Sequence, residues 1–255
     1  MTTELRGMRA LVTGATAGIG EAIARAFAGS GARVLVHGRD ASRAAALAAE
    51  INGDVVVGDL LDPATPASLV SAARATGGLD ILVNNAGFEE HAILDDLDGQ
   101  TLERLMRVNF LAPVETVRLA VPLLEASGRG TVVNVTSIHE SVPVAGNGGY
   151  AAAKAALAAW TRTASVELGP RRVRINNLAP GAIVTDMNRE LIARVGHERF
   201  ARWIPLGAPG SVDHVARAAL FLAGADSAYV TGTTLTVDGG YSNHLVRYAP
   251  DPGAS

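Results

Sequence analysis

Short apolar runs alternate with longer amphipathic or alanine-rich segments along most of the chain. Such runs between glycine-rich or polar turns are typical of buried strands, and the longer segments are typical of helices. The predicted strands cover residues 8–12, 33–37, 55–60, 80–87, 131–137, 172–178 and 233–237. The predicted helices include one that ends at Gly29 and others over 100–126, 150–168 and 211–222. This alternation predicts an α/β fold with a doubly wound, seven-stranded parallel sheet of the Rossmann type.

The composition is that of one compact domain over residues 1–255, with a C-terminal tail at 241–255. Hydrophobic residues make up 48% of the chain and charged residues 18%, which is a globular and not a disordered balance. The chain has no cysteine, which excludes disulfides, zinc–thiolate sites and thiol catalysis, and we expect no metal site.

The net charge of −3 and the pI near 6.1 provide no long-range attraction to nucleic acid or to anionic lipid. A small-molecule partner is therefore expected. No apolar run approaches the roughly 20 residues of a membrane-spanning helix. Residues 1–6 lack the apolar core of a signal peptide. We therefore expect a cytoplasmic protein without membrane or nucleic-acid partners.

A glycine-rich turn separates the first predicted strand from the first predicted helix, and residues 13–20 read Thr-Gly-Ala-Thr-Ala-Gly-Ile-Gly. Strand, glycine turn and helix in this order are typical of a phosphate-binding cradle. The glycines let the backbone approach a pyrophosphate, and the helix directs its free N–H groups toward it. A tight turn without a ligand is the alternative. The candidate cofactor-binding residues in this turn are Gly14, Thr16, Gly18, Ile19 and Gly20.

The ends of the second and third predicted strands concern the choice between NAD and NADP. An NAD site usually has an acid at the end of the second strand, whereas a 2′-phosphate requires a cation without a repelling carboxylate. Gly38 and Arg39 stand there, which favours NADP, although Asp40 follows and NAD remains possible. An ordinary solvated position is the alternative for Arg39. Asp59 and Leu60 are candidates for contact with the adenine, and a surface-loop role is the alternative for Asp59.

Two more strand ends complete the predicted cofactor site. Asn-Ala-Gly closes the fourth strand, and the segment after the sixth is rigid at a proline and then permissive at a glycine. Such a backbone suits contact with a flat ring. Because ligands bind outside the carboxyl ends of strands in these sheets, all the strand ends should meet in one crevice. The candidates from these two ends are Asn85, Ala86, Gly87, Pro180, Gly181, Ile183 and Thr185.

Tyr150 and Lys154 are four residues apart at the start of an alanine-rich helix, so their side chains share one helical face. A free tyrosine titrates at about 10, and a nearby cation lowers that pKa. Tyr150 is therefore predicted to exchange a proton near neutral pH. Ser137 ends the fifth strand, where its hydroxyl is expected to hydrogen-bond the oxygen on which Tyr150 acts. Packing or capping is the alternative for an isolated Tyr-x-x-x-Lys pair.

Asn109 lies within the predicted helix over 100–126, four residues before Pro113. Asparagine is a weak helix former, and proline perturbs the helix that contains it. We expect a disturbed turn at this point, with a freed carbonyl group that binds water.

The order and spacing of these motifs resemble the short-chain dehydrogenase/reductase family over essentially the whole chain. The matching stretches are Thr13-Gly-x-x-x-Gly-x-Gly20, Asn84-Asn-Ala-Gly87, Asn109, Ser137, Tyr150-x-x-x-Lys154, Pro180-Gly181 and Asp238-Gly-Gly240. The resemblance implies an NAD(P)(H)-linked oxidoreductase that interconverts a secondary alcohol and a carbonyl, with Tyr150 as acid/base and Ser137 orienting the substrate oxygen. It also implies that Lys154 lowers the tyrosine pKa and binds the nicotinamide ribose. In the same way it implies that Asn109 holds a water of the proton relay and that the protein is a homotetramer or a dimer.

A closer likeness, to the bacterial glucose 1-dehydrogenases within that family, concerns the substrate side. The stretches that resemble that group are Ser137-Ile-His-Glu140, 180–190 and 204–207. His139, Glu140 and Met187 are candidate substrate contacts because polar groups suit a polyhydroxylated sugar, and solvated loop positions are the alternative for the first two. Residues 186–209 are interpreted as a lid-like substrate segment. A reductase of 3-oxoacyl thioesters or small ketones remains an alternative, as does a catalytically silent dinucleotide-binding redox sensor.

Overall fold

A sheet of parallel strands forms the centre of the computed structural model, which describes residues 4–185 and 201–243. Within these ranges, seven strands run in the order β3-β2-β1-β4-β5-β6-β7. Their bounds are β1 Arg9–Val12, β2 Arg33–Gly38, β3 Asp54–Val57, β4 Ile81–Asn84, β5 Thr131–Val135, β6 Arg174–Pro180 and β7 Thr234–Val237. The chain winds outward from β1 to β3, crosses to β4, and winds outward again to β7. The predicted α/β fold with a doubly wound, seven-stranded parallel sheet is confirmed.

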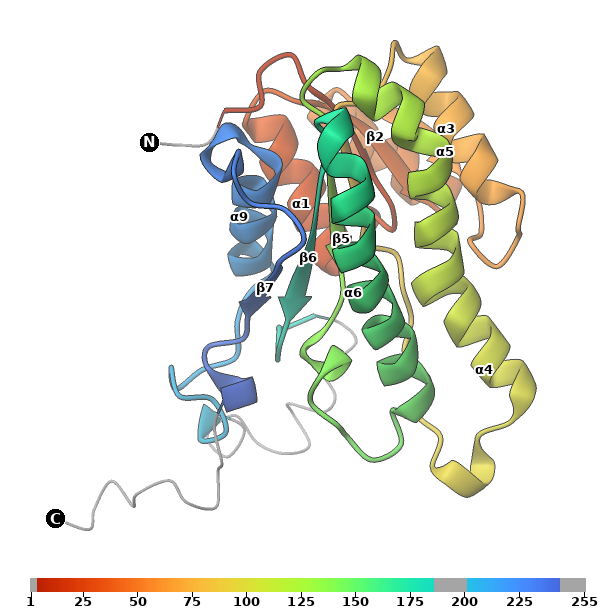
Figure 1. Cartoon of the computed structure of the whole chain (residues 1–255), viewed down its shortest axis with the longest axis vertical. Helices are drawn as coiled ribbons and strands as arrows, with labels where there is room; N and C mark the ends of the chain where they lie inside the picture. Colours follow the sequence, from red (N-terminus) through yellow and green to blue (C-terminus); the bar gives the residue numbers. More distant parts are fainter. Residues whose placement is uncertain (1–3, 186–200, 244–255) are drawn as a thin grey trace, which may run out of the picture.

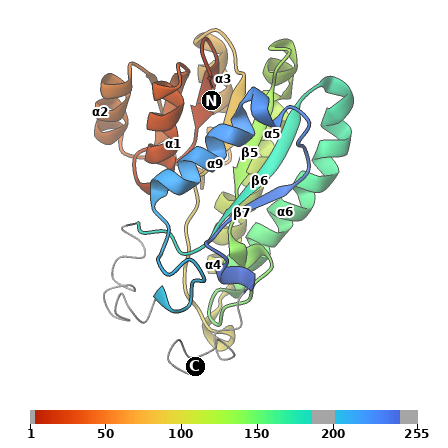
Figure 2. The same cartoon turned by 90° about the vertical axis from the view of Figure 1, so that its left-hand side faces the viewer.

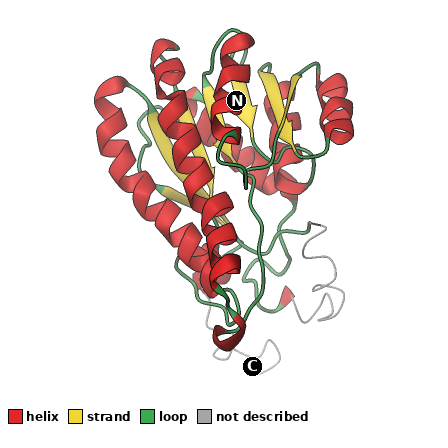
Figure 3. Cartoon of the chain, turned by 90° about the vertical axis from the view of Figure 1, so that its right-hand side faces the viewer, coloured by secondary structure: helices red, strands yellow, loops and turns green. Residues whose placement is uncertain are grey.

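Helices cover both faces of the sheet (Figures 1 and 3). The helices on the first face are α1 (Gly18–Gly29), α2 (Ala41–Ile51) and α9 (Val212–Ala223), with α9 beside α1 in Figure 2. The helices on the second face are α3 (Thr65–Ala75), α5 (Ala112–Ala126) and α6 (Gly148–Leu168). Helix α4 (Gly99–Met106) leads through a π-helical turn, η2 (Arg107–Leu111), into α5. Short 3₁₀ turns are η1 Leu94–Asp96, η3 Ile138–Glu140, η4 Gly169–Arg171, η5 Ala225–Ser227 and η6 Tyr241–Asn243.

Each central strand contributes to two apolar cores, because successive side chains of a strand point to opposite faces. In β1, Val12 packs into the core of the first face with Phe27, whereas Leu11 packs into the core of the second face with Leu82. Strands that are buried on both faces form continuous apolar runs without alternation. This is why the strands were visible in the sequence as short, uninterrupted apolar runs.

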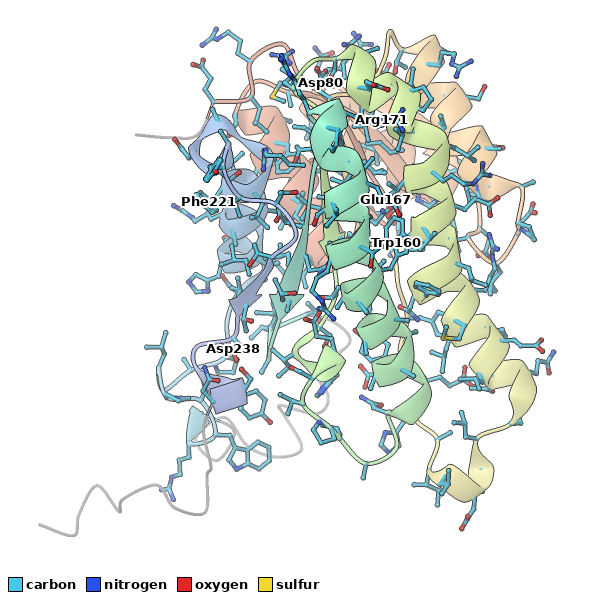
Figure 4. The ribbon with its side chains drawn as sticks, in the orientation of Figure 1. Asp80, Trp160, Glu167, Arg171, Phe221 and Asp238 are labelled. Carbon is cyan, nitrogen blue, oxygen red and sulfur yellow. The ribbon has the colours of Figure 1, made fainter. Side chains whose placement is uncertain are left out.

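Asp80 lies at the end of the sheet opposite the arrowheads of the strands (Figure 4). Its carboxylate accepts hydrogen bonds from Arg9 Nε at 3.1 Å, from the Arg9 backbone at 2.8 Å and from Arg129 Nε at 2.9 Å. Burial raises the pKa of Asp80, but these hydrogen bonds outweigh it and hold the pKa below its ordinary value. The cluster therefore ties β1, β4 and the start of β5 together, away from the predicted site.

Several predicted boundaries differ from the structure. β5 ends at Val135, so Ser137 lies two residues beyond the strand, and the helix predicted to begin at Tyr150 begins at Gly148. The predicted lid-like segment falls largely outside the described residues; of its described part, Ile204 is 3% exposed and packs against Trp203. None of the described helices combines the length and the apolar character that a membrane-spanning helix needs.

Candidate active site

The turn between β1 and α1 has the backbone shape of a phosphate-binding loop. Gly14 and Gly18 have φ values of 62° and 55°, in the region that favours glycine. A Cβ on Gly20 would lie 2.2 Å from the Gly14 carbonyl oxygen, and one on Gly14 would lie 2.9 Å from Ala86 Cα. Ala17 precedes α1 and supplies no side-chain cap, so the first N–H groups of the helix are available to an anion. These features fit the pyrophosphate of a dinucleotide.

Thr13 and Asn85 hold this turn against the end of β4. Asn85 Nδ2 donates to the carbonyl oxygens of Thr13 at 2.9 Å and of Gly14 at 3.2 Å. In return, Thr13 Oγ1 accepts hydrogen bonds from the backbone N–H groups of Asn85 at 3.0 Å and of Ala86 at 3.1 Å. Gly14 and Asn85, which the sequence assigned to one crevice, therefore lie side by side.

His37 is a further polar contact of the glycine turn, and the sequence reasoning missed it. This β2 residue is 2% exposed, and its Nδ1 accepts the N–H of Gly14 at 3.3 Å. Its Nε2 is 3.1 Å from the Gly58 carbonyl oxygen, so Nε2 holds the proton of the neutral ring. Burial lowers the pKa of His37 against the opposing effects of Gly58 and Asp59. A histidine within an apolar strand was the available signal.

The end of β2 is closely packed against the glycine turn. A Cβ on Gly38 would lie 2.4 Å from Thr16 Cγ2, so only glycine fits there. The side chain of Arg39 is 79% exposed, and its Nη1 is 3.9 Å from Asp59 Oδ2. Asp40 caps α2 by accepting two backbone N–H groups of its first turn, which directs its carboxylate toward that helix.

The segment after β6 reaches back to the first turn of α1. A Cβ on Gly181 would lie 2.4 Å from the Cβ of Asp238, which follows β7 and is labelled in Figure 4. Ile183 is 2% exposed and belongs to the core of the first face. A Cβ on Gly18 would lie 3.8 Å from Thr185 Cγ2, and both residues line one cavity between α1 and α9.

Four other candidates occupy different surroundings. Pro180 is the last residue of β6, and Ile19 is partly buried against the core of the first face. The side chain of Leu60 is buried in the core of the second face, so contact with a ligand there falls to its backbone. Met187 lies outside the described residues.

Tyr150 and Lys154 lie in the first two turns of α6, as their spacing predicts. Lys154 is 3% exposed; its Nζ donates to the Val135 carbonyl oxygen at 2.9 Å and lies 5.6 Å from the centre of the Tyr150 ring. The pKa of Tyr150 is raised to about 12, mainly by burial and also by the charge of Glu89. A hydrogen bond with Ser137 acts in the opposite direction and lowers this pKa. Burial lowers the pKa of Lys154 to about 8.

The pKa of Tyr150 is thus raised in this structure, and the lowering effect of Lys154 stays a prediction. The ammonium group is directed at the Val135 carbonyl, under the face of the ring. Desolvation of the phenol then dominates, because it disfavours the charged phenolate.

The helix over 100–126 is broken by the five-residue π-helical turn η2, which contains Asn109. Ala112 N–H donates to the Arg107 carbonyl, five residues earlier. Pro113 has no N–H to donate to the Asn109 carbonyl, so an α-helical hydrogen bond is impossible at that step. The predicted disturbance next to Pro113 is confirmed.

The side chain of Asn109 is completely buried between this turn and the end of β4. Its Nδ2 donates to the carbonyl oxygens of Phe88 and Leu105, both at 3.0 Å. Its Oδ1 is buried and has no partner in the described part of the chain. A Cβ on Gly87 would lie 2.6 Å from this Oδ1 and 3.3 Å from Lys154 Nζ. Asn109, Gly87 and Lys154 are thus brought together from distant parts of the sequence.

The turn after β5 presents Ser137, His139 and Glu140. Ser137 Oγ accepts the backbone N–H of His139 at 3.2 Å and starts η3. His139 Nδ1 lies 3.0 Å from the Val142 carbonyl oxygen, so Nδ1 carries the hydrogen that this carbonyl accepts. Glu140 Oε1 accepts the hydroxyl of Thr234 at 3.1 Å, which directs this carboxylate toward β7.

Comparisons with known proteins agree with this arrangement. A family model described as enoyl-(acyl carrier protein) reductase matches residues 14–242. The chain is 36% identical to a glucose 1-dehydrogenase of Gluconobacter oxydans over 243 residues, 92% of this chain and 91% of that protein. A gluconate 5-dehydrogenase from Burkholderia cenocepacia in complex with NADP and tartrate superposes with a TM-score of 0.90, 33% identity and coverage of 95% and 98%. A 3-oxoacyl (acyl-carrier-protein) reductase from Agrobacterium tumefaciens with NADP bound gives a TM-score of 0.89, 34% identity and coverage of 93% and 95%.

Proposed function

Because the chain belongs to the short-chain dehydrogenase/reductase family, we propose that it interconverts a secondary alcohol and a carbonyl of a sugar or polyol with NADP as preferred cofactor. The observation that supports this most is the meeting of Ser137, Tyr150 and Lys154 at the carboxyl ends of the strands. Intact groups of this kind argue against a catalytically silent redox sensor.

The side chains around the glycine turn suit the dinucleotide. Gly14 and Gly20 let the turn pack closely on itself and on Ala86, and Asn85 fixes the turn in that shape. The same cofactor, when bound, supplies the hydride acceptor for oxidation or the hydride donor for reduction. The preference for NADP rests first on the exposed guanidinium of Arg39. It rests also on Asp40, whose carboxylate caps α2, and on relatives whose structures hold NADP.

Tyr150 acts as the acid or base on the substrate oxygen in this proposal. A pKa of about 12 keeps its hydroxyl protonated at neutral pH, so Oη donates a proton to a carbonyl oxygen during reduction. Ser137 Oγ holds the same substrate oxygen through a hydrogen bond. Lys154, charged below about pH 8, stabilises the phenolate that remains after the proton has left. Asn109 contributes its Oδ1, which has no partner among the described residues, to the path along which the proton is replaced.

A sugar or polyol is favoured as substrate by the glucose 1-dehydrogenase and gluconate 5-dehydrogenase relatives. His139, whose backbone N–H binds Ser137 Oγ, supplies an imidazole that suits a hydroxylated substrate. The second candidate, reduction of a 3-oxoacyl thioester, is favoured by the likeness to the Agrobacterium reductase.

Exchange of Tyr150 for phenylalanine tests the chemistry. We expect turnover to fall by about 100-fold to 10,000-fold, while NADP(H) binding stays intact, because only the proton-transferring group is removed. The absorbance of reduced nicotinamide measures turnover with glucose, gluconate and polyols in one panel and with 3-oxoacyl esters and cyclic ketones in another. Tyr229→Phe is the matched control, since Tyr229 is fully exposed. Turnover of Tyr150→Phe close to that of the unaltered protein would overturn the assignment.

A further inference from the structure

Two loops meet near the start of α6, residues 88–92 after β4 and residues 141–147 before α6. The backbone N–H of Ala92 donates to the Gly146 carbonyl at 2.9 Å. A Cβ on Gly146 would lie 2.1 Å from the His91 ring, so the imidazole packs directly on this glycine. Glu89 Oε1 accepts a hydrogen bond from Asn147 Nδ2. These contacts hold the two loops together. The residues that make them lie outside the motifs that the sequence analysis identified.

The contact between Glu89 and Asn147 fixes a carboxylate next to the first turn of α6. Asn147 is 3% exposed, precedes the helix and is three residues before Tyr150, so both residues lie on one helical face. The negative charge of Glu89 also raises the pKa of Tyr150. An acidic group is favourable at a helix N-terminus, which supports this placement.

The other charged groups around Tyr150 are already engaged within the described part of the chain. Lys154 binds the Val135 carbonyl beneath the ring, and Glu140 is directed at β7. Glu90, the neighbour of Glu89, is paired with Arg104 on α4. Glu89 has only its Oε1 paired among the described residues, as does Glu140, whose buried Oε2 has no described partner. Glu89 differs from Glu140 because it is exposed, whereas Glu140 is partly buried. Asn147 Oδ1, which is buried, likewise has no described partner.

We propose that Glu89 determines specificity by accepting a hydrogen bond from a second hydroxyl group of the substrate, adjacent to the carbon on which Tyr150 acts. A carboxylate only accepts hydrogen bonds, and hydrogen bonds to charged groups are stronger than those between neutral groups. The substrate class is then a vicinal diol or a sugar, and alcohols without the adjacent hydroxyl are poor substrates. This inference rests on the proposed function, because it concerns the same site.

Glu89→Gln is the variant that tests the proposal, because the amide oxygen still accepts from Asn147 while an NH₂ group replaces the free acceptor. The probes are two pairs that differ by one adjacent hydroxyl: glucose with 2-deoxyglucose, and cis-1,2-cyclohexanediol with cyclohexanol. We expect kcat/KM for the hydroxylated member to fall about tenfold or more, mainly through KM, and the other member to change little. Glu90→Gln is the matched control and should leave both members of each pair unchanged.

A second measurement follows the Tyr150 hydroxyl directly. Loss of the Glu89 charge should lower the pKa of Tyr150, so the phenolate absorbance titration of Glu89→Gln should shift to lower pH, with Tyr150→Phe as the blank. An unshifted titration, or an equal loss for both members of a pair, would overturn the role of Glu89 and leave the proposed function standing. A protein that binds NADP(H) but turns over none of the alcohols or ketones would instead overturn the proposed function, and this inference with it.

Discussion

Replacement of Lys154 by methionine should stabilise the fold although it removes a residue of the site. Burial lowers the pKa of this lysine from 10.5 to about 8. At about 1.4 kcal/mol per pKa unit, holding the ammonium in the native state costs about 3 kcal/mol at neutral pH. Methionine is of similar length and carries no charge. It leaves the Val135 carbonyl without its donor, which costs about 1–3 kcal/mol, so the net gain in stability should be about 0–2 kcal/mol.

The pH dependence of this gain distinguishes the ionisation from ordinary packing. Because the native pKa of Lys154 is lower than the unfolded one, the unfolded chain binds more protons between about pH 8 and 10.5. The stability of the unaltered protein therefore rises with pH across this window relative to Lys154→Met. The difference between the two should shrink by roughly 3 kcal/mol and change sign before pH 10.5.

Urea denaturation at fixed protein concentration, repeated from pH 7 to 10.5, measures both quantities. Tyr150→Phe is the control, because it keeps the buried ammonium and should keep the pH slope of the unaltered protein up to about pH 9, below the pKa of about 10 of a free tyrosine. Parallel stability curves for Lys154→Met and the unaltered protein would refute the reasoning. A variant less stable than the unaltered protein at pH 7 would show that the lost hydrogen bond outweighs the relief of desolvation.

Two other residues give predictions of different kinds. Arg39→Ala should weaken NADPH binding about tenfold and NADH binding much less, because the proposed site pairs this exposed guanidinium with the 2′-phosphate. Nucleotide fluorescence titration measures both affinities, and equal losses would contradict the proposed NADP preference. Asp80→Asn should destabilise the fold by about 2–3 kcal/mol at neutral pH, a value reduced because its two guanidinium partners are 35% and 49% exposed. The pKa of Asp80 is held below its ordinary value, so the difference in unfolding free energy should be complete above that ordinary pKa. It should vanish at lower pH, as acid protonates the native carboxyl. Urea titrations measure it, and a pH-independent difference would speak against the charge as its cause.

Much of the scaffold could be predicted because burial on both faces leaves a strong signal in the sequence. Runs such as that around Leu11 are apolar at every position because both faces of the strand are buried, so they stand out in the sequence. Parallel strands also present their carboxyl ends at the same edge of the sheet. The contact between Gly14 and Asn85 follows from this rule alone. The position of the disturbed turn at Asn109 could be predicted, because Pro113 cannot donate a hydrogen bond to the Asn109 carbonyl. Its π-helical geometry could not be predicted.

The parts that escaped prediction depend on contacts between loops and on the balance of opposing electrostatic effects. Glu89 and Asn147 are 58 positions apart in segments without periodicity, so no pattern connects them. The spacing of Tyr150 and Lys154 correctly placed the cation near the ring. It contained no information on the depth of burial or on the Val135 carbonyl that holds the ammonium.

The opposed pKa shifts of Tyr150 and Lys154 also bear on the direction of the reaction. At neutral pH the tyrosine is a neutral acid and the lysine a cation, which is the state that donates a proton to a carbonyl oxygen. Raising the pH alone prepares the phenolate poorly, because Lys154 loses its charge from about pH 8, well before Tyr150 ionises near 12. The chain by itself therefore holds Tyr150 in its acid form at neutral pH.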